Sequence, residues 1–309
     1  NKDHTKILQS FIDENSIILL PDITLYINKD GLKIGSDKKV IFQKNTKIKF
    51  LGPANERYSD VIKIYNAKNV EVLNAVVVGS KNNRQIQSGQ WSAGISILNS
   101  SNIKIINPRI SETYGDGIFV GSEDGGFCQY VTITGGWVDS ARRNGISVTS
   151  AKDILLENIL ISNTNGHNPE SGIDIEPSWE KDVLNNISLK NIYTFNNKAA
   201  GIAINLNSLG MDRMQDIKEV TVLIDGHTDV GSNNAFLTSL NAVENKYDAK
   251  GSIIIKNAVW KSSRDMSYWR TPSNHRINIT FSNITLDRIQ QKKFETTVKT
   301  SQNMKLIKK

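Results

Sequence analysis

The chain contains a single cysteine, Cys128, among its 309 residues. One thiol excludes both an internal disulfide framework and a zinc site built on several cysteines. We interpret Cys128 as a small buried apolar residue. A chain without cross-links depends on a continuous hydrophobic core, and a hydrophobic fraction of 38% can supply one.

Long apolar runs and helical periodicity are also scarce. No stretch approaches the roughly 18 apolar residues of a transmembrane helix, so no membrane span is expected. The best helical pattern is His4 to Glu14, which predicts a short cap helix at the N-terminus. A doubly wound α/β fold is excluded because its amphipathic crossover helices are missing.

Acidic residues are outnumbered, and the formal net charge is +7. Much of this charge lies in residues 288–309, which contain seven lysines and arginines and only one glutamate. A basic balance suits an anionic partner such as an acidic polysaccharide or nucleic acid. Helix-turn-helix, zinc-finger and aromatic RNA-binding patterns are absent, so we do not expect a nucleic-acid partner.

Internal repeats are the main positive signal. The phrase Gly-Ile-x-Ile/Val recurs at spacings of 23, 28, 27 and 29 residues, beginning at Gly94, Gly117, Gly145, Gly172 and Gly201. Between these phrases lie other short stretches of alternating β-branched residues, bounded by Asn, Ser and Gly. Strands of period two that repeat in this way predict the coils of a solenoid.

The predicted fold is therefore all-β, a right-handed parallel β-helix with a short N-terminal cap helix, in one domain spanning residues 1–309. We expect a cap and first coils over 1–60, regular coils over 61–285, and a polar basic tail over 286–309.

Three phrases between residues 112 and 180 carry a family resemblance: Gly115-Asp116-Gly117-Ile118, Arg143-Asn144-Gly145-Ile146-Ser147-Val148 and Ser171-Gly172-Ile173-Asp174-Ile175-Glu176-Pro177. They resemble phrases of polysaccharide-degrading bacterial and phage-tailspike β-helices of the pectate-lyase-like superfamily. The resemblance implies that the protein binds or degrades a polysaccharide. It also implies a secreted, cell-surface or periplasmic location in a bacterium or phage, and it allows a homotrimer.

The chain departs from the best-known members of this superfamily. It lacks the Asn-Thr-Asp, Asp-Asp and Gly-His-Gly set of polygalacturonases, the Arg-x-Pro-x-x-Arg element of pectate lyases and the Asp-Pro-His-Asp element of alginate epimerases. The resemblance therefore does not identify the reaction.

The candidate catalytic groups are carboxylates. If Ile173 and Ile175 point into the core, Asp174 and Glu176 project together from the opposite face, roughly 6.5 Å apart at the backbone. Such a pair suits two-acid glycoside hydrolysis, retaining or inverting, with one pKa raised by the neighbouring charge. Asp116, two coils away, is a third candidate. The alternatives are an exposed polar face or a cation site for the pair, and a turn-forming role for Asp116.

Residues around these acids are candidates for substrate binding. Arg142 and Arg143 suit recognition of an acidic substituent, or they neutralise the acids structurally. Asn144 either binds a sugar hydroxyl or caps a ladder of asparagines.

Three further side chains complete the predicted site. His167 is a candidate base or a solvated loop residue, and Trp179 and Tyr114 are candidate platforms for sugar rings, with corner packing as the alternative.

We expect a depolymerase of glycoside-hydrolase type acting on an acidic bacterial or algal glycan. The alternatives are a lyase or C5-epimerase on a uronate polymer, with His167 as base, and a non-enzymatic carbohydrate-binding module or adhesin. No cofactor is expected. The Gly-rich loop with Glu123 and Asp124 could hold Ca²⁺, but it shows too few ligands to assign a metal site.

Overall fold

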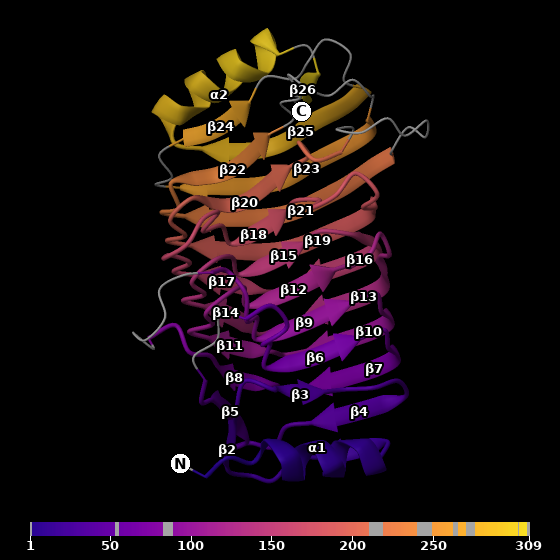
Figure 1. Ribbon diagram of the computed structural model, residues 1–309. Helices are drawn as coiled ribbons and strands as arrows, with labels where there is room; N and C mark the ends of the chain where they lie inside the picture. Colours follow the sequence, from indigo (N-terminus) through magenta and orange to yellow (C-terminus); the bar gives the residue numbers. More distant parts are fainter. Residues whose placement is uncertain are drawn as a thin grey trace.

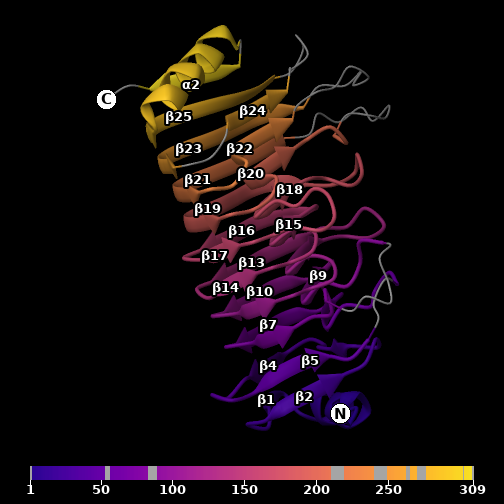
Figure 2. The same cartoon turned by 90° about the vertical axis from the view of Figure 1, so that its left-hand side faces the viewer.

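The computed structural model describes residues 2–52, 56–82, 89–209, 219–239, 249–261, 265–269, 276–301 and 303–307. Over these residues the chain winds upward as a stack of parallel strands, with a helix at each end (Figure 1). The right-handed parallel β-helix predicted from the repeats is confirmed. Figure 2 shows that the longer connections leave the coils on one side, beside β9, β15 and β18.

Three columns of strands form the walls of the solenoid. The first column contains β1 (Ile17–Leu19), β4 (Lys38–Ile41), β7 (Lys68–Leu73), β10 (Ser101–Ile106), β13 (Cys128–Thr134), β16 (Ala151–Glu157), β19 (Leu184–Phe195), β21 (Glu219–Val230), β23 (Lys250–Lys261), β25 (Arg276–Leu286) and β26 (Met304–Ile307). The second contains β2 (Thr24–Ile27), β5 (Lys47–Phe50), β8 (Val76–Val78), β11 (Arg109–Ser111), β14 (Trp137–Asp139) and β17 (Leu160–Ser162). At β19 the second column merges with the first, because this long strand pairs with both β16 and β17.

The third column forms a separate nine-stranded sheet. It contains β3 (Leu32–Lys33), β6 (Ile62–Tyr65), β9 (Ile95–Leu98), β12 (Ile118–Gly121), β15 (Ile146–Val148), β18 (Ile173–Ile175), β20 (Ala200–Asn205), β22 (Asn234–Ser239) and β24 (Asp265–Trp269). This column carries the Gly-Ile phrases, and its register aligns them: Ile118 pairs with Ile146, and Ile146 with Ile173.

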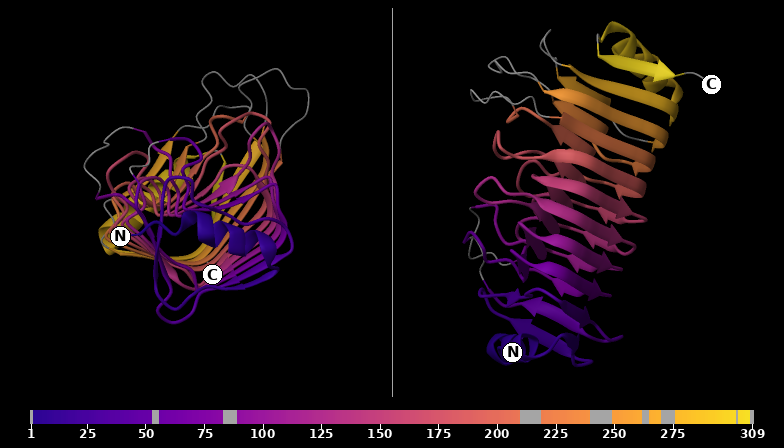
Figure 3. Two further views of the ribbon diagram at one scale, coloured as in Figure 1. Left: turned by 60° about the horizontal axis from the view of Figure 1, so that its bottom comes forward. Right: turned by 90° about the vertical axis from the view of Figure 1, so that its right-hand side faces the viewer.

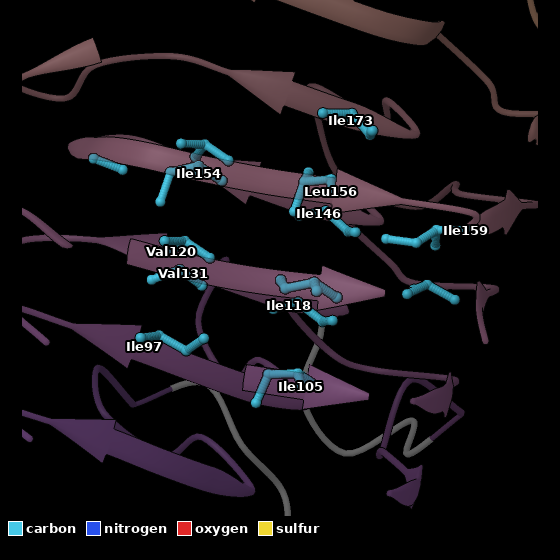
Figure 4. Close-up of a cluster of buried hydrophobic side chains, with 14 of the residues drawn as sticks. Ile97, Ile105, Ile118, Val120, Val131, Ile146, Ile154, Leu156, Ile159 and Ile173 are labelled. Atoms are coloured by element: carbon cyan, nitrogen blue, oxygen red, sulfur yellow. The ribbon is translucent and has the colours of Figure 1, made fainter. Parts of the chain in front are cut away.

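The core is a stack of aliphatic side chains from all three walls. Ile97, Ile118 and Ile146 of the third column face Ile105 and Val131 of the first across the interior (Figure 4). Each of these residues is buried, because alternate residues of a strand point to opposite faces. Cys128 is buried in the same core, as predicted, and burial raises the pKa of its thiol to about 11.

Asparagines shape the corners of the coils. Asn69 and Asn102 both adopt positive φ, a conformation that asparagine tolerates better than most residues. Their side chains stack: Asn102 Nδ2 donates to Asn69 Oδ1 at 2.7 Å, and Asn186 repeats the contact with Asp153 Oδ1 at 2.7 Å. These ladders explain the asparagine-rich turns of the sequence.

Helices close both ends of the solenoid. α1 (Thr5–Glu14) lies across the first coil and buries Leu8 and Ile12 against it, as the N-terminal pattern predicts (Figure 3). At the other end, the segment expected to be a polar tail contains α2 (Arg288–Thr300) and β26.

The C-terminal helix folds because it has one narrow apolar face. Phe294 and Val298, one helical turn apart, are buried, and the Phe294 ring lies 5.0 Å from Phe281 and 6.1 Å from Trp260. Charged and uncharged polar residues make up most of the rest of the helix, so the composition of the segment does not indicate its role as a cap.

Candidate functional site

Strand β18 presents the predicted acid pair. Ile173 and Ile175 are fully buried in the core, so Asp174 projects from the opposite face, and Glu176 follows directly after the strand. In the register of the sheet, Asp174 lies between Ser147 of β15 and Ala203 of β20. Alignment of the phrases that begin at Gly145, Gly172 and Gly201 places the same small residues beside Asp174, and they leave a recess around the carboxyl groups.

The two carboxyl groups differ in environment. Asp174 is 2% exposed, and its pKa is raised well above the usual value, first by burial and then by the charge of Glu176; Arg143 opposes this shift. Glu176 is partly exposed and accepts a hydrogen bond of 2.6 Å from Asn205 Nδ2. Asp174 therefore holds its proton more tightly than a solvated carboxyl group does.

Asn144 forms hydrogen bonds with both Asp174 and Asp116. Its side chain is fully buried, and Nδ2 donates to Asp174 Oδ2 and to Ser147 Oγ, each at 3.0 Å. Its Oδ1 accepts from the backbone N–H of Ser171, and its own N–H donates to Asp116 Oδ1, again at 3.0 Å. Asn144 thus positions the acids, and its burial excludes the predicted contact with a sugar hydroxyl.

Asp116 and Arg143 form an ion pair beside Asn144. Arg143 Nη1 lies 2.9 Å from Asp116 Oδ2 and 3.2 Å from Oδ1. The Nε atom of Arg143 is buried and has no hydrogen-bond partner in the described part of the chain. This geometry agrees with the structural alternative for Arg143, in which the guanidinium neutralises an acid.

A cavity of about 440 Å³ lies on the outer side of the third column, beside the acid pair. Five of the predicted site residues contribute to its wall: Asp116, Arg143, Asp174, Glu176 and Trp179. The Trp179 ring is 63% exposed at the edge of the cavity, a suitable place for stacking on a sugar.

Three other predicted residues lie outside the described wall. The Arg142 guanidinium lies 4.3 Å from the centre of the Tyr114 ring and donates to the carbonyl of Gly89 at 2.8 Å. Tyr114 is itself 2% exposed, which excludes a sugar platform. His167 lies in a loop where its N–H bonds the Arg142 carbonyl, and partial burial lowers the pKa of its imidazole.

Several cavity residues were missed by sequence reasoning. Arg57 pairs with Glu123 at 3.1 Å, and the Tyr58 hydroxyl also donates to Glu123. The Arg57 guanidinium lies 5.3 Å from the Tyr58 ring centre and 5.4 Å from that of Trp91. Arg57 and Tyr58 stand in an irregular segment outside the strand repeats, so no periodic signal marks them. Glu123, the candidate calcium ligand, is engaged by these two side chains.

Asp60 is a fifth carboxyl group in the described cavity wall. It accepts hydrogen bonds from the Tyr65 hydroxyl and, at 2.6 Å, from the Ala93 N–H, and burial raises its pKa. The register places it in the same column as Asp116, two coils further toward the N-terminus. An alignment of the coils that requires the Gly-Ile pair does not include this residue, because its coil has Val61 at the position where the five aligned phrases have glycine.

Two features are absent from the residues that the structure describes. Among the described residues, no three His, Cys, Asp or Glu side chains are grouped so that they could hold a metal ion. In the same part of the chain no helix is long and apolar enough to cross a membrane.

Comparison of the amino-acid sequence with known proteins does not assign the chain to a family. No family model matches the chain. Residues of this chain are 29% identical, over 163 positions, to the uncharacterized protein YclG of Bacillus subtilis; the match covers 47% of this chain and 28% of that protein.

Solved structures share the architecture at low sequence identity. The tailspike gp49 of Acinetobacter baumannii bacteriophage Fri1, a capsular polysaccharide depolymerase, matches with a TM-score of 0.56 and 16% identity over 92% of this chain and 55% of its own. The Streptococcus pneumoniae adhesin PfbA matches at 0.62 and 12%, over 93% and 92%. The A-module of the Azotobacter vinelandii mannuronan C-5 epimerase AlgE6 matches at 0.54 and 12%, over 99% and 94%. The neighbours thus include enzymes that degrade or modify polysaccharides, and the likeness shows the fold alone.

Proposed function

We propose that this protein is a polysaccharide depolymerase that hydrolyses glycosidic bonds in the cavity beside β18. The observation that carries the proposal is the Asp174–Glu176 pair, in which a buried carboxyl group with a raised pKa opens into a cavity edged by the exposed Trp179 ring. A carboxyl group that keeps its proton near neutral pH is the general acid that glycoside hydrolysis requires.

The acid role belongs to the Asp174–Glu176 pair as a unit. Asp174 and Glu176 are two residues apart on the same face, and the charge of Glu176 acts on Asp174, so the two carboxyl groups approach a sugar ring from the same side. They cannot attack from opposite sides of one sugar ring in this geometry. Within the pair, Asp174 has the raised pKa, so its carboxyl group can deliver a proton to the leaving oxygen.

The base role then falls to Asp116. Two coil steps separate Asp116 from Asp174, roughly 10 Å along the solenoid axis at the backbone, and their side chains converge on Asn144. This separation suits the roughly 6.5–9.5 Å between the carboxyl groups of inverting enzymes, which leaves space for a water molecule. Asp116 pairs with Arg143, and its Oδ2 retains a lone pair that could accept a proton from water.

The lyase and epimerase alternatives receive less support from these contacts. They require a base and a cation beside the uronate carboxylate, but His167 and Arg142 lie outside the described cavity wall, and Arg143 is paired with Asp116. The tailspike depolymerase and the adhesin among the fold neighbours support an extracellular or cell-surface location.

The test is incubation with a panel of acidic, neutral and amino-bearing polysaccharides, in which reducing ends and ultraviolet absorbance are followed together. New reducing ends without absorbance, lost in Asp174→Asn, are expected. Absorbance from an unsaturated uronate would instead indicate a lyase. Binding without any change in polymer length would indicate a carbohydrate-binding module.

A further inference from the structure

We infer that the glycan segment held in this cavity carries no acidic substituent and is neutral or amino-bearing. The inference rests on the proposed function in one respect, that the ligand is a polysaccharide. It reverses the expectation of an acidic glycan that the basic composition and the adjacent arginines suggest.

The described wall of the cavity is rich in carboxyl groups. It contains five carboxyl groups and only two guanidinium groups. The carboxyl groups belong to Asp60, Asp116, Glu123, Asp174 and Glu176, and the guanidinium groups belong to Arg57 and Arg143. Asp174 holds its proton and burial raises the pKa of Asp60, but a carboxylate or sulfate on the sugar would still lie beside the other three acidic groups, in a partly enclosed site where repulsion is weakly screened.

Both arginines are already occupied by carboxylates. Arg143 holds Asp116 with both oxygens within 3.2 Å, and only 4% of the Asp116 side chain is exposed. Arg57 holds Glu123 at 3.1 Å, and Tyr58 donates to the same carboxylate. An anionic sugar could engage either guanidinium only by displacing a partner, which would leave a carboxylate unpaired in the cavity wall.

The groups that remain available suit neutral or cationic partners. Glu176 is partly exposed, and its Oε2 can accept a hydrogen bond from a sugar hydroxyl or ammonium group while Oε1 keeps its bond from Asn205. Arg143 Nε–H has no partner in the described residues and can donate to a neutral sugar oxygen while Nη1 keeps its ion pair.

The net charge of +7 does not contradict this inference, because much of the excess lies elsewhere. Residues 288–309 contribute seven cationic side chains, and α2, at the start of this stretch, caps the end of the solenoid beyond β25 (Figure 1). The cavity lies several coils away, beside β6 to β18.

The first experiment compares each acidic polymer with its own neutral form. Polygalacturonate and alginate are used natively and after carboxyl reduction to the neutral sugars, with chitosan and a soluble β-glucan as the amino-bearing and neutral probes. Binding to the wild-type protein is read from quenching of tryptophan fluorescence, and cleavage from reducing ends, at an ionic strength that screens the basic exterior.

We expect at least one reduced, neutral or amino-bearing polymer to bind at least tenfold more tightly than the native acidic ones. Tighter binding or faster cleavage of a native acidic polymer than of its reduced form would overturn the inference. Preferential binding of uncharged polymers without cleavage of any would overturn the proposed hydrolysis and leave the inference standing. Absence of binding to every polymer would count against both.

A second experiment frees one arginine. Glu123→Gln removes the carboxylate partner of Arg57 and should raise affinity for native polygalacturonate about twofold to fivefold, as expected for one partly exposed ion pair. Glu56→Gln is the matched control: it removes the same charge one residue from Arg57, from a glutamate that pairs with Lys29. Equal effects of the two variants, with both still folded by circular dichroism, would contradict the occupied-arginine argument.

Discussion

Asn144 Nδ2 donates a 3.0 Å hydrogen bond to Asp174 Oδ2 from a position with no solvent exposure. The amide therefore acts on the acid without lining the cavity. An N–H donor favours the charged form of a carboxyl group, so Asn144 limits the rise in the pKa of Asp174 that burial causes.

Asn144→Ala should consequently move the alkaline limb of the kcat profile to higher pH and lower kcat about tenfold, with little change in KM. The measurement is a pH–rate profile. Asn158→Ala, which removes an exposed asparagine of a corner ladder, is the control. An unchanged pH profile together with a raised KM would instead place Asn144 in contact with the sugar.

Asp174→Asn should abolish activity while stabilising the fold at neutral pH. The folded-state pKa of Asp174 is raised, so the charged form is disfavoured in the native protein, and stability is lost as pH rises from about 4 through the raised pKa. An amide avoids this cost, about 1–3 kcal/mol, and can still accept from Asn144. Urea unfolding at pH 5 and pH 8 measures the difference; the gain should be larger at pH 8. A variant less stable than wild type at both pH values would contradict the assignment.

If Asp116 is the base, hydrolysis should invert the anomeric centre. Proton NMR of the first product formed shows its configuration directly. Asp116→Asn should lower kcat by about 10²- to 10⁴-fold, because a positioned base contributes on this scale. Retention of configuration would assign nucleophilic attack to the Asp174–Glu176 pair and leave Asp116 a partner of Arg143.

His227 should make the fold sensitive to acid. The imidazole is fully buried between Trp260 Nε1, which donates to Nδ1 at 3.0 Å, and Thr194 Oγ1, and burial lowers its pKa to about 3. The unfolded chain binds a proton below about pH 6.5, so stability should fall between pH 6.5 and 3, by on the order of 4 kcal/mol. The free energy of unfolding, measured with denaturant at several pH values in this range, is expected to depend less steeply on pH in His227→Gln than in the wild type. Equal slopes would rule out His227 as the source.

Phe294→Ala should destabilise the C-terminal end by about 3–5 kcal/mol, because the ring is buried against Phe281 and Trp260. Thermal unfolding compared with the exposed control Lys299→Ala measures the effect. Equal stability of the two variants would mean that α2 does not cap the core.

Much of the architecture follows from the sequence, because Gly172-Ile173-Asp174-Ile175 and its relatives specify both the inward isoleucines and the outward acid. The same alignment correctly predicts Ser147 and Ala203 as the neighbours of Asp174. These features depend on strand alternation and stacking, which are periodic.

What could not be predicted depends on local, non-periodic geometry. Arg142 and Arg143 are adjacent, yet one packs on Tyr114 and the other pairs with Asp116, and no pattern distinguishes them. Asp60 is detectable only after the coils are aligned without requiring glycine. The cap helix at residues 288–300 shows one apolar pair, Phe294 and Val298, within a charged segment.

The stacked coils also make the spacing of the acids discrete. Asp116 and Asp174 belong to different coils whose separation is set by backbone hydrogen bonds, so no change of loop length can move them by a fraction of a step. Inserting or deleting one whole coil between β12 and β18 would alter their separation by about 4.8 Å. In a stack of coils, loops can therefore change during evolution without moving the acids. The distance between carboxyl groups on different coils cannot change gradually between the values of inverting and retaining glycosidases.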